Sequence, residues 1–169
     1  MFPTYFIAIV ALPIIYFFFI RKERKEKQRI QTLFPEYVHS QSVRVWRAKL
    51  ARAKYYINKD DIGVMIFAVK TEQDSPYGGK AWAVVRDDGK LMGYMPKKTM
   101  QSYEEWAGND VCTGIGQVNY DEKTNHLWAN LIVFAPETGD EALESEINNY
   151  ISWATKTYGA DYIPQRYKI

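Results

Sequence analysis

The sequence has few of the residues on which small catalytic and metal sites depend. Its 169 residues include one cysteine, Cys112, and two histidines, His39 and His126. A single cysteine excludes a disulfide within the chain and a cluster of thiolate ligands. Cys112 falls in a predicted strand, and the histidines are far apart in the sequence, so the chain shows no adjacent nucleophile and base. We expect a binding protein and not an enzyme, with no cofactor and no metal.

Charge is missing from the beginning of the chain. No residue from 2 to 20 is charged, and the run is dense in Ile, Val, Phe, Ala and Leu. As a helix these nineteen residues would extend about 28 Å, close to the hydrocarbon thickness of a bilayer. A cleaved signal peptide is the alternative, but a positive region before the run and a small-residue cleavage site after it are both absent. The pattern predicts a transmembrane helix at residues 2–20.

Basic residues follow this apolar run directly. Between residues 21 and 29 there are six basic and two acidic side chains. The positive-inside rule then places the amino terminus outside and residues 21–169 in the cytoplasm, so the prediction is a single-pass membrane protein with a basic juxtamembrane stalk at 21–35. A topology signal is the simpler interpretation of this cluster, although its cations would also attract anionic headgroups. The residues predicted at the membrane surface are Arg21, Lys22, Arg24 and Lys25.

The remaining residues, 36–169, show short strand patterns separated by turn signals. Asp88-Gly89 is a tight hairpin signal between two such patterns, and short turns between neighbouring strands favour an antiparallel sheet. We expect one small cytoplasmic α+β domain, an antiparallel β-barrel with a short helix and a C-terminal helix. Strands are predicted at 43–50, 62–69, 81–85, 91–95, 111–118 and 126–134, and helices at 97–106 and 140–158. For 43–50 a helix is the alternative, because of Trp46 and the alanine and lysine content.

Outside the basic cluster the chain is close to neutral. Of its 22 basic and 20 acidic residues, removing the six and two at 21–29 leaves 16 and 18. Nucleic-acid binding would therefore depend on a local patch and not on the charge of the whole surface. The candidate is the stretch 44–59, which has no acid, although a solvated face is its simpler interpretation. Its basic and aromatic members are Arg44, Trp46, Arg47, Lys49, Arg52, Lys54, Tyr55, Tyr56 and Lys59.

Short motifs in residues 69–106 point to a known family. They are Glu72, Pro76-Tyr77, the strand that begins Ala81-Trp82, and Gly93-Tyr94-Met95-Pro96 before a helix. In these motifs and their spacing the chain resembles the HIRAN domain, a small β-barrel module related to OB and SH3-like folds. Ser75 and Gly78 stand where the family usually has Asn and Asp.

The resemblance implies that the domain captures the 3′ end of single-stranded DNA. It places Tyr77 on a base, Tyr94 and Lys97 beside the terminal nucleotide, and Ser75 as a shortened polar contact. The alternatives are that Tyr77 packs its own loop and that Tyr94 is a core residue. With the basic and aromatic stretch included, the predicted nucleic-acid-binding residues are Tyr77, Tyr94, Lys97, Ser75, Lys54, Tyr55 and Tyr56.

Two functions are consistent with these patterns. The first is a membrane-anchored, HIRAN-like binding module for single-stranded DNA or 3′ DNA ends. The second is a membrane-tethered protein-interaction module that has lost nucleic-acid binding. Its aromatic surface, or the acidic segment 137–146, would then bind a cytoplasmic protein. The loss of Asn and Asp beside Pro76-Tyr77 favours the second function, whereas Tyr77, Tyr94 and Lys97 favour the first.

Overall fold

The computed structural model describes residues 20–22, 24–25, 37–41, 43–76, 78–108, 112–136 and 140–168. The chain divides into two compact units, Met1–Val38 and His39–Ile169. The strands and the two long helices belong to the second unit, which is called the domain below.

The amino-terminal prediction is corrected by the structure. Ile20, Arg21, Lys22, Arg24 and Lys25 are helical, and the four basic residues are exposed. Across the described ranges no helix is both long and apolar enough to cross a membrane. This finding contradicts the fold class with a transmembrane helix at 2–20 and the single-pass localisation with the amino terminus outside. Residues 2–19 lie outside the described residues.

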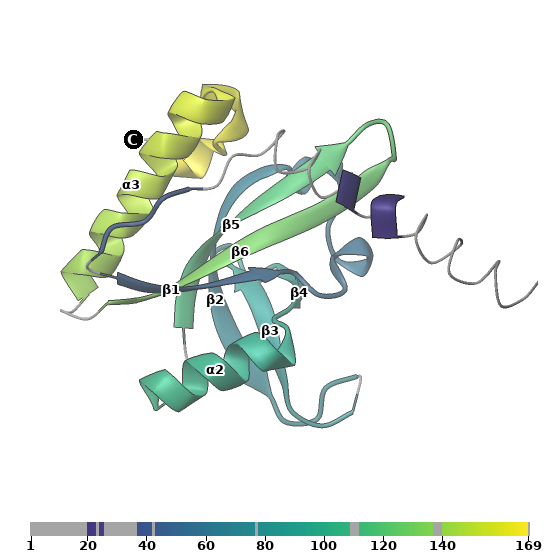
Figure 1. The fold of residues 1–169 in the computed structure, drawn as a ribbon, viewed down its shortest axis with the longest axis vertical. Coiled ribbons are helices and arrows are strands. Elements are labelled where there is room, and N and C mark those ends of the chain that lie inside the picture. Colours follow the sequence, from purple (N-terminus) through teal and green to yellow (C-terminus); the bar gives the residue numbers. More distant parts are fainter. Residues whose placement is uncertain are drawn as a thin grey trace, which may run out of the picture. The chain divides into compact units, whose positions relative to one another are not determined.

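Six antiparallel strands among the described residues form one sheet with the order β1-β6-β5-β2-β3-β4 (Figure 1). Hairpins join β2 to β3, β3 to β4 and β5 to β6, as the short turns in the sequence predict. The antiparallel sheet, the short helix and the C-terminal helix of the predicted domain are all present. The strands are β1 (Val43–Lys49), β2 (Gly63–Glu72), β3 (Ala81–Arg86), β4 (Leu91–Tyr94), β5 (Cys112–Asp121) and β6 (His126–Pro136).

Backbone hydrogen bonds connect the chain that leaves β1 to the opposite edge of the sheet. The Leu50 N–H donates to the Ala129 carbonyl of β6 at 2.9 Å. One residue later, the Ala51 N–H donates to the Tyr94 carbonyl of β4 at 2.9 Å, and the Tyr94 N–H donates back to the Ala51 carbonyl at 3.1 Å. The sheet therefore curls toward a barrel.

The two faces of the sheet pack against different partners because successive residues of a strand point to opposite sides. One face lines the barrel interior, where Met92, Met95 and Met100 are buried. Other interior side chains are Met65, Phe67, Val69, Val118, Leu131 and Val133.

Two helices cover the sheet. α2 (Lys97–Ala107) follows β4, lies against β1 and β3, and buries Met100 and Tyr103. α3 (Asp140–Tyr158) lies against β6 and β1, with Tyr150, Ile151 and Ala154 buried. The bounds of α3 are those that its apolar spacing predicts.

The C-terminal tail docks on the sheet through tyrosine hydroxyls. In the 3₁₀ turn Ala160–Tyr162, the Tyr162 hydroxyl donates to Asn119 Oδ1 at 2.9 Å. Burial raises the pKa of the Tyr162 phenol. In the turn Gln165–Tyr167, the Tyr167 hydroxyl accepts the Ile66 N–H of β2 at 3.0 Å.

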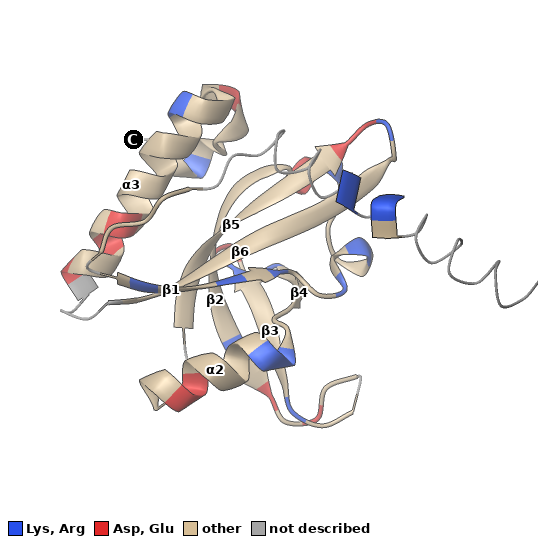
Figure 2. Ribbon diagram, viewed as in Figure 1, with Lys and Arg blue, Asp and Glu red and all other residues tan. Residues whose placement is uncertain are grey.

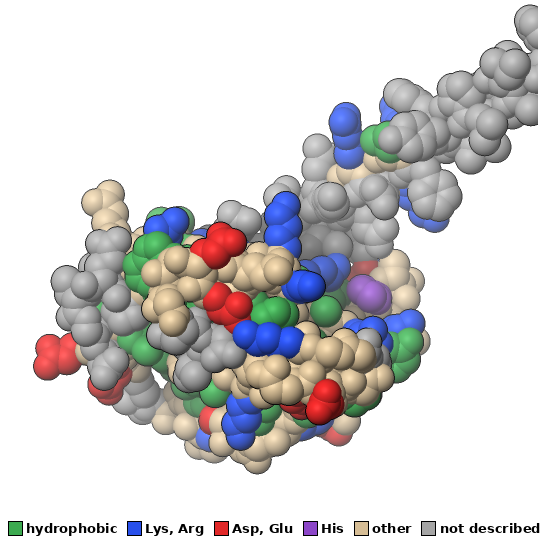
Figure 3. All heavy atoms as spheres, turned by 90° about the horizontal axis from the view of Figure 1, so that it is seen from below, with side chains coloured by type: hydrophobic (Ala, Val, Ile, Leu, Met, Phe, Trp, Pro, Cys, Tyr) green, Lys and Arg blue, Asp and Glu red, His purple; other side chains and the backbone are tan. Residues whose placement is uncertain are grey.

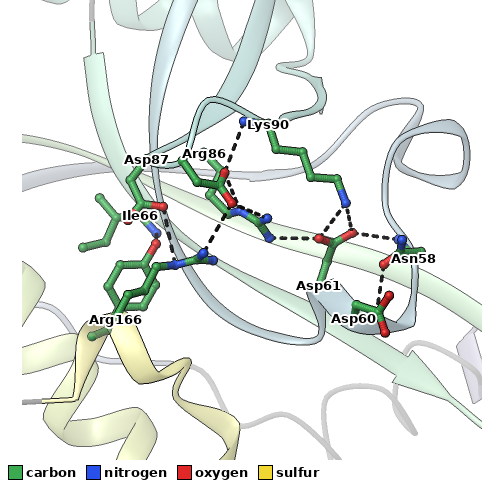
Figure 4. A network of polar contacts seen from close by, with 10 residues as sticks. Asn58, Asp60, Asp61, Ile66, Arg86, Asp87, Lys90 and Arg166 are labelled. Carbon is green, nitrogen blue, oxygen red and sulfur yellow. Dashed lines mark hydrogen bonds and ion pairs between the residues drawn. The ribbon is translucent and has the colours of Figure 1, made fainter.

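A polar network is centred on Asp61, whose side chain is only 3% exposed (Figure 4). Its carboxylate accepts the Asn58 N–H at 2.8 Å, Arg86 Nη1 at 2.9 Å and Lys90 Nζ at 2.6 Å. Burial alone would raise the pKa of Asp61, but the hydrogen bonds from Lys90, the Asn58 backbone and Arg86 bring it below its usual value. The 3₁₀ turn Lys59–Asp61 is thereby tied to the β3–β4 hairpin.

The same network continues to the tail through Asp88. Arg86 Nη2 donates to Asp88 Oδ2 at 2.6 Å, and Arg166 Nη1 donates to the same oxygen at 3.3 Å. The Arg86 hydrogen bond holds the pKa of the Asp88 carboxyl well below its usual range. The network therefore joins three segments that are distant in sequence.

Acid is expected to destabilise the domain through this network. An unfolded aspartate has a pKa of about 3.9, and those of Asp61 and Asp88 are lower in the folded state. Their contribution is complete above the unfolded pKa and is lost as the pH falls through the folded pKa. In urea titrations of the full chain, the urea concentration at the unfolding midpoint should stay constant from pH 7 to about pH 5. It should decrease once the pH is below about 4. In Asp61→Asn the fall should be shallower; an equal fall would assign the effect to other carboxyl groups.

Candidate functional site

An exposed aromatic turn follows β1. It is the 3₁₀ turn Ala53–Tyr55, anchored by the buried side chains of Ala53 and Ile57. Tyr55 is 65% exposed, and Lys54 Nζ lies 4.7 Å from the centroid of its ring. Because the anchors on either side are fixed in the core, the Lys54–Tyr55 pair is held at the surface.

Tyr56 lies against Tyr94, which the β4 strand supplies. Their ring centroids are 5.9 Å apart with an interplanar angle of 71°. Tyr94 is 5% exposed, and its hydroxyl donates to Glu72 Oε2 at 3.2 Å. Tyr94 is thus a buried support for Tyr56, which agrees with its interpretation as a core residue.

The beginning of α2 adds positive charge. Pro96 provides no side-chain cap, and α2, whose residues are all described, has no acid in its first turn. Its first two residues, Lys97 and Lys98, are exposed, and Figure 2 shows them as a basic end of the helix. Two cations beside the positive end of the helix dipole favour a bound anion. Lys97 follows Tyr94 by three residues, which span at most about 10 Å of extended chain.

The β2–β3 loop carries the other two predicted residues. The Ser75 N–H donates to the Gly79 carbonyl at 3.2 Å, and the Ser75 carbonyl accepts the Gly78 N–H at 3.0 Å. Ser75 itself is buried. Tyr77 lies outside the described residues, so its role in stacking stays a prediction.

The basic stretch 44–59 does not form a single surface. Arg44 lies over the rings of two tryptophans, Lys49 lies 5.9 Å from the centroid of Trp128, and Lys59 lies 4.3 Å from that of Tyr120. Alternation along β1 separates neighbouring residues onto opposite faces. Of the predicted residues, Lys54, Tyr55 and Tyr56 remain together in one turn, and Tyr56 lies beside Tyr94.

The structure brings together an aromatic group that the sequence analysis did not predict. Trp46 of β1 lies 5.2 Å from Tyr103 and 5.4 Å from Trp106 of α2, between ring centroids. The guanidinium of Arg44 lies 5.4 Å from the Trp46 ring and 5.5 Å from the Trp106 ring. The i, i+3 spacing of Tyr103 and Trp106 was a signal for a shared helix face, but the sequence does not show which strand that face meets.

The acidic segment 137–146 is not a continuous acidic surface in its described part. Glu146 is buried, and its carboxylate accepts the Ser40 N–H at 3.2 Å. Glu141 and Glu144 are exposed, while residues 137–139 lie outside the described residues.

Side chains of both charges are scattered over the face of the domain seen in Figure 3. This mixture agrees with a nearly neutral domain, whose attraction for a polyanion must be local. Within the described ranges, no group of three or more His, Cys, Asp or Glu residues is placed to hold a metal ion.

These observations define a small, curled antiparallel sheet module with an exposed aromatic and cationic surface. No protein-family model and no curated protein matches the chain. Among solved structures, the chain is similar to the crystal structure of the HIRAN domain of human HLTF, with 15% identity and a TM-score of 0.36, over 63% of this chain and 88% of that one. Similarity at this level neither assigns the chain to that family nor transfers a function.

Proposed function

We propose that the domain His39–Ile169 is a binding module, not an enzyme, for single-stranded nucleic acid. Its site consists of the aromatic turn at Lys54, Tyr55 and Tyr56 and the beginning of α2 at Lys97 and Lys98. The observation that supports it most is the 65% exposure of Tyr55, with Lys54 over its ring; the basic end of α2 follows Tyr94, which supports Tyr56.

Each part of this site suits one part of a nucleotide. A base stacks on the ring of Tyr55, which contributes about 1–3 kcal/mol per base. A phosphate binds at the amino terminus of α2, where Lys97, Lys98 and the helix dipole add favourable charge. A single strand fits because its bases are free to stack on side chains, whereas those of a duplex are paired.

The preference for a 3′ end belongs to the same proposal, and the motifs at Glu72, Pro76-Tyr77 and 93–96 support it. The hydrogen bond between Tyr94 and Glu72 joins two of these motifs at 3.2 Å. This contact holds β4 and the end of β2 together beneath Tyr56.

Tyr55→Ala is expected to weaken binding of a single-stranded oligonucleotide by about 5- to 150-fold, because it removes one stacked base contact. Fluorescence anisotropy of the full chain with labelled oligonucleotides, at low and moderate salt, measures this change. Oligonucleotides with a free and with a blocked 3′ end test the end preference in the same assay.

Tyr120→Ala is the matched control for this experiment. Tyr120 also carries a lysine over its ring, with Lys59 Nζ at 4.3 Å from the centroid, but it lies on β5 and outside the proposed site. Binding should be unchanged in this variant. The absence of binding by the unmodified chain at low salt, or an equal loss in both variants, would contradict the proposal.

A further inference from the structure

The cluster of Arg44, Trp46 and Trp106 reaches the surface of the domain. Trp106 is 41% exposed, and Arg44 is exposed beside it. The inner side of the cluster is closed by Tyr103, which is buried. Tryptophan and arginine are among the residue types that contribute most to binding contacts.

The indole N–H of Trp46 has its partner within the domain. Trp46 Nε1 donates to Ser102 Oγ of α2 at 3.3 Å. The cluster therefore presents to solvent the ring of Trp106 and the guanidinium of Arg44, which lies 5.5 Å from the centroid of that ring. A planar aromatic base is the ligand that stacks on such a surface, since cation–π and stacking contacts act together.

An exposed stripe of α2 connects this cluster to the proposed binding site. Lys98, Ser102 and Trp106 follow at intervals of four residues and are all exposed, so they lie on one face of the helix. From Lys98 to Trp106 the helix rises about 12 Å. With stacked bases about 3.4 Å apart, a strand bound at Lys98 reaches Trp106 after about four nucleotides.

One of the two acids of α2 is directed away from this path. Glu104 is paired with Lys80 Nζ at 2.8 Å and accepts Trp82 Nε1 at 2.8 Å, so its charge is directed toward β3. Glu105 is exposed on the same turn as Trp106 and supplies a control.

From this geometry we infer that Arg44, Trp46 and Trp106 form a second stacking subsite for the same single strand. The subsite deepens the proposed function and rests on it. It makes the domain select for strand length: a short oligonucleotide occupies the Tyr55 and Lys97 end alone, and a longer one also stacks on Trp106.

The test compares a trinucleotide with an octanucleotide of the same composition, in anisotropy titrations of the full chain. The unmodified chain should bind the octanucleotide more tightly by about 5-fold or more, the gain from at least one stacked base. Trp106→Ala should remove most of this gain and leave trinucleotide binding unchanged. Arg44→Ala should reduce the gain in the same way, and Trp106→Tyr should retain much of it because the ring is kept.

Glu105→Gln is the control, since it changes the neighbouring residue and keeps the stacking surface; the length gain should be equal or larger. If Trp106→Ala binds the trinucleotide and keeps the full octanucleotide affinity, the second subsite is wrong and the proposed function stands. Failure of the unmodified chain to bind either length overturns both. Loss of trinucleotide binding in Trp106→Ala also overturns it, because the two sites would then not be separate.

Discussion

Asp61→Ala is expected to destabilise the domain by about 3–5 kcal/mol, the usual effect of removing one partner from a buried ion pair. The substitution leaves Arg86, whose side chain is 10% exposed, without one of its two carboxylates. It also removes the acceptor of Lys90 Nζ at 2.6 Å and of the Asn58 N–H at 2.8 Å. Urea unfolding followed by circular dichroism at pH 7 measures the change.

Asp60→Ala is the matched control for this prediction. Asp60 is exposed, and its backbone N–H donates to Asn58 Oδ1 at 3.0 Å. An alanine at this position keeps that hydrogen bond. A change within about 0.5 kcal/mol is expected, as for most surface substitutions. A loss below about 1 kcal/mol in Asp61→Ala would show that water replaces the carboxylate in this network, as it does for exposed ion pairs.

The elements with strong local signals could be predicted from the sequence. α3 has apolar residues at helical spacing and ends before Gly159, which adopts a positive φ of 90°, so its bounds coincide with the prediction. The strand patterns and the Asp88-Gly89 turn likewise predicted the antiparallel sheet. These features depend on nearby residues, and local patterns are sufficient to identify them.

The end of β5 depends on distant residues and could not be predicted in this way. The strand β5 continues to Asp121, past the predicted end at 118, although Asn119 is polar and buried. Asn119 is satisfied by the Tyr162 hydroxyl from the tail at 2.9 Å. A contact across 43 positions leaves no periodic signal in the sequence.

The candidate site could be predicted only where its residues are neighbours in the sequence. Lys54, Tyr55 and Tyr56 are adjacent in sequence and stay together in the turn. By contrast, the pairing of Trp46 with Trp106 depends on α2 packing against β1, and the burial of Tyr94 depends on the bridge to Ala51. A basic stretch in a strand is divided between two faces, which composition alone does not reveal.

Gly93→Ala is expected to destabilise the domain by about 3–5 kcal/mol, because it combines backbone strain with a collision. Gly93 has a φ of +145°, and a Cβ added there would lie 2.6 Å from the Ala51 carbonyl oxygen. That oxygen accepts the Tyr94 N–H in the bridge that curls the sheet. Urea unfolding measures the loss of stability, and anisotropy with a single-stranded oligonucleotide measures the effect on the aromatic turn.

Gly89→Ala separates strain from collision. Gly89 also has a positive φ, of 85°, but a Cβ there would meet no described atom within 4 Å, so a loss of about 1–2 kcal/mol is expected from strain alone. Because the bridge positions the turn of Tyr55 relative to β4, Gly93→Ala should also weaken oligonucleotide binding under conditions where it remains folded, whereas Gly89→Ala should not. Equal losses in both variants would mean that the close approach of Ala51 and Gly93 relaxes without disturbing the site, and that the bridge is not what holds the aromatic turn in place.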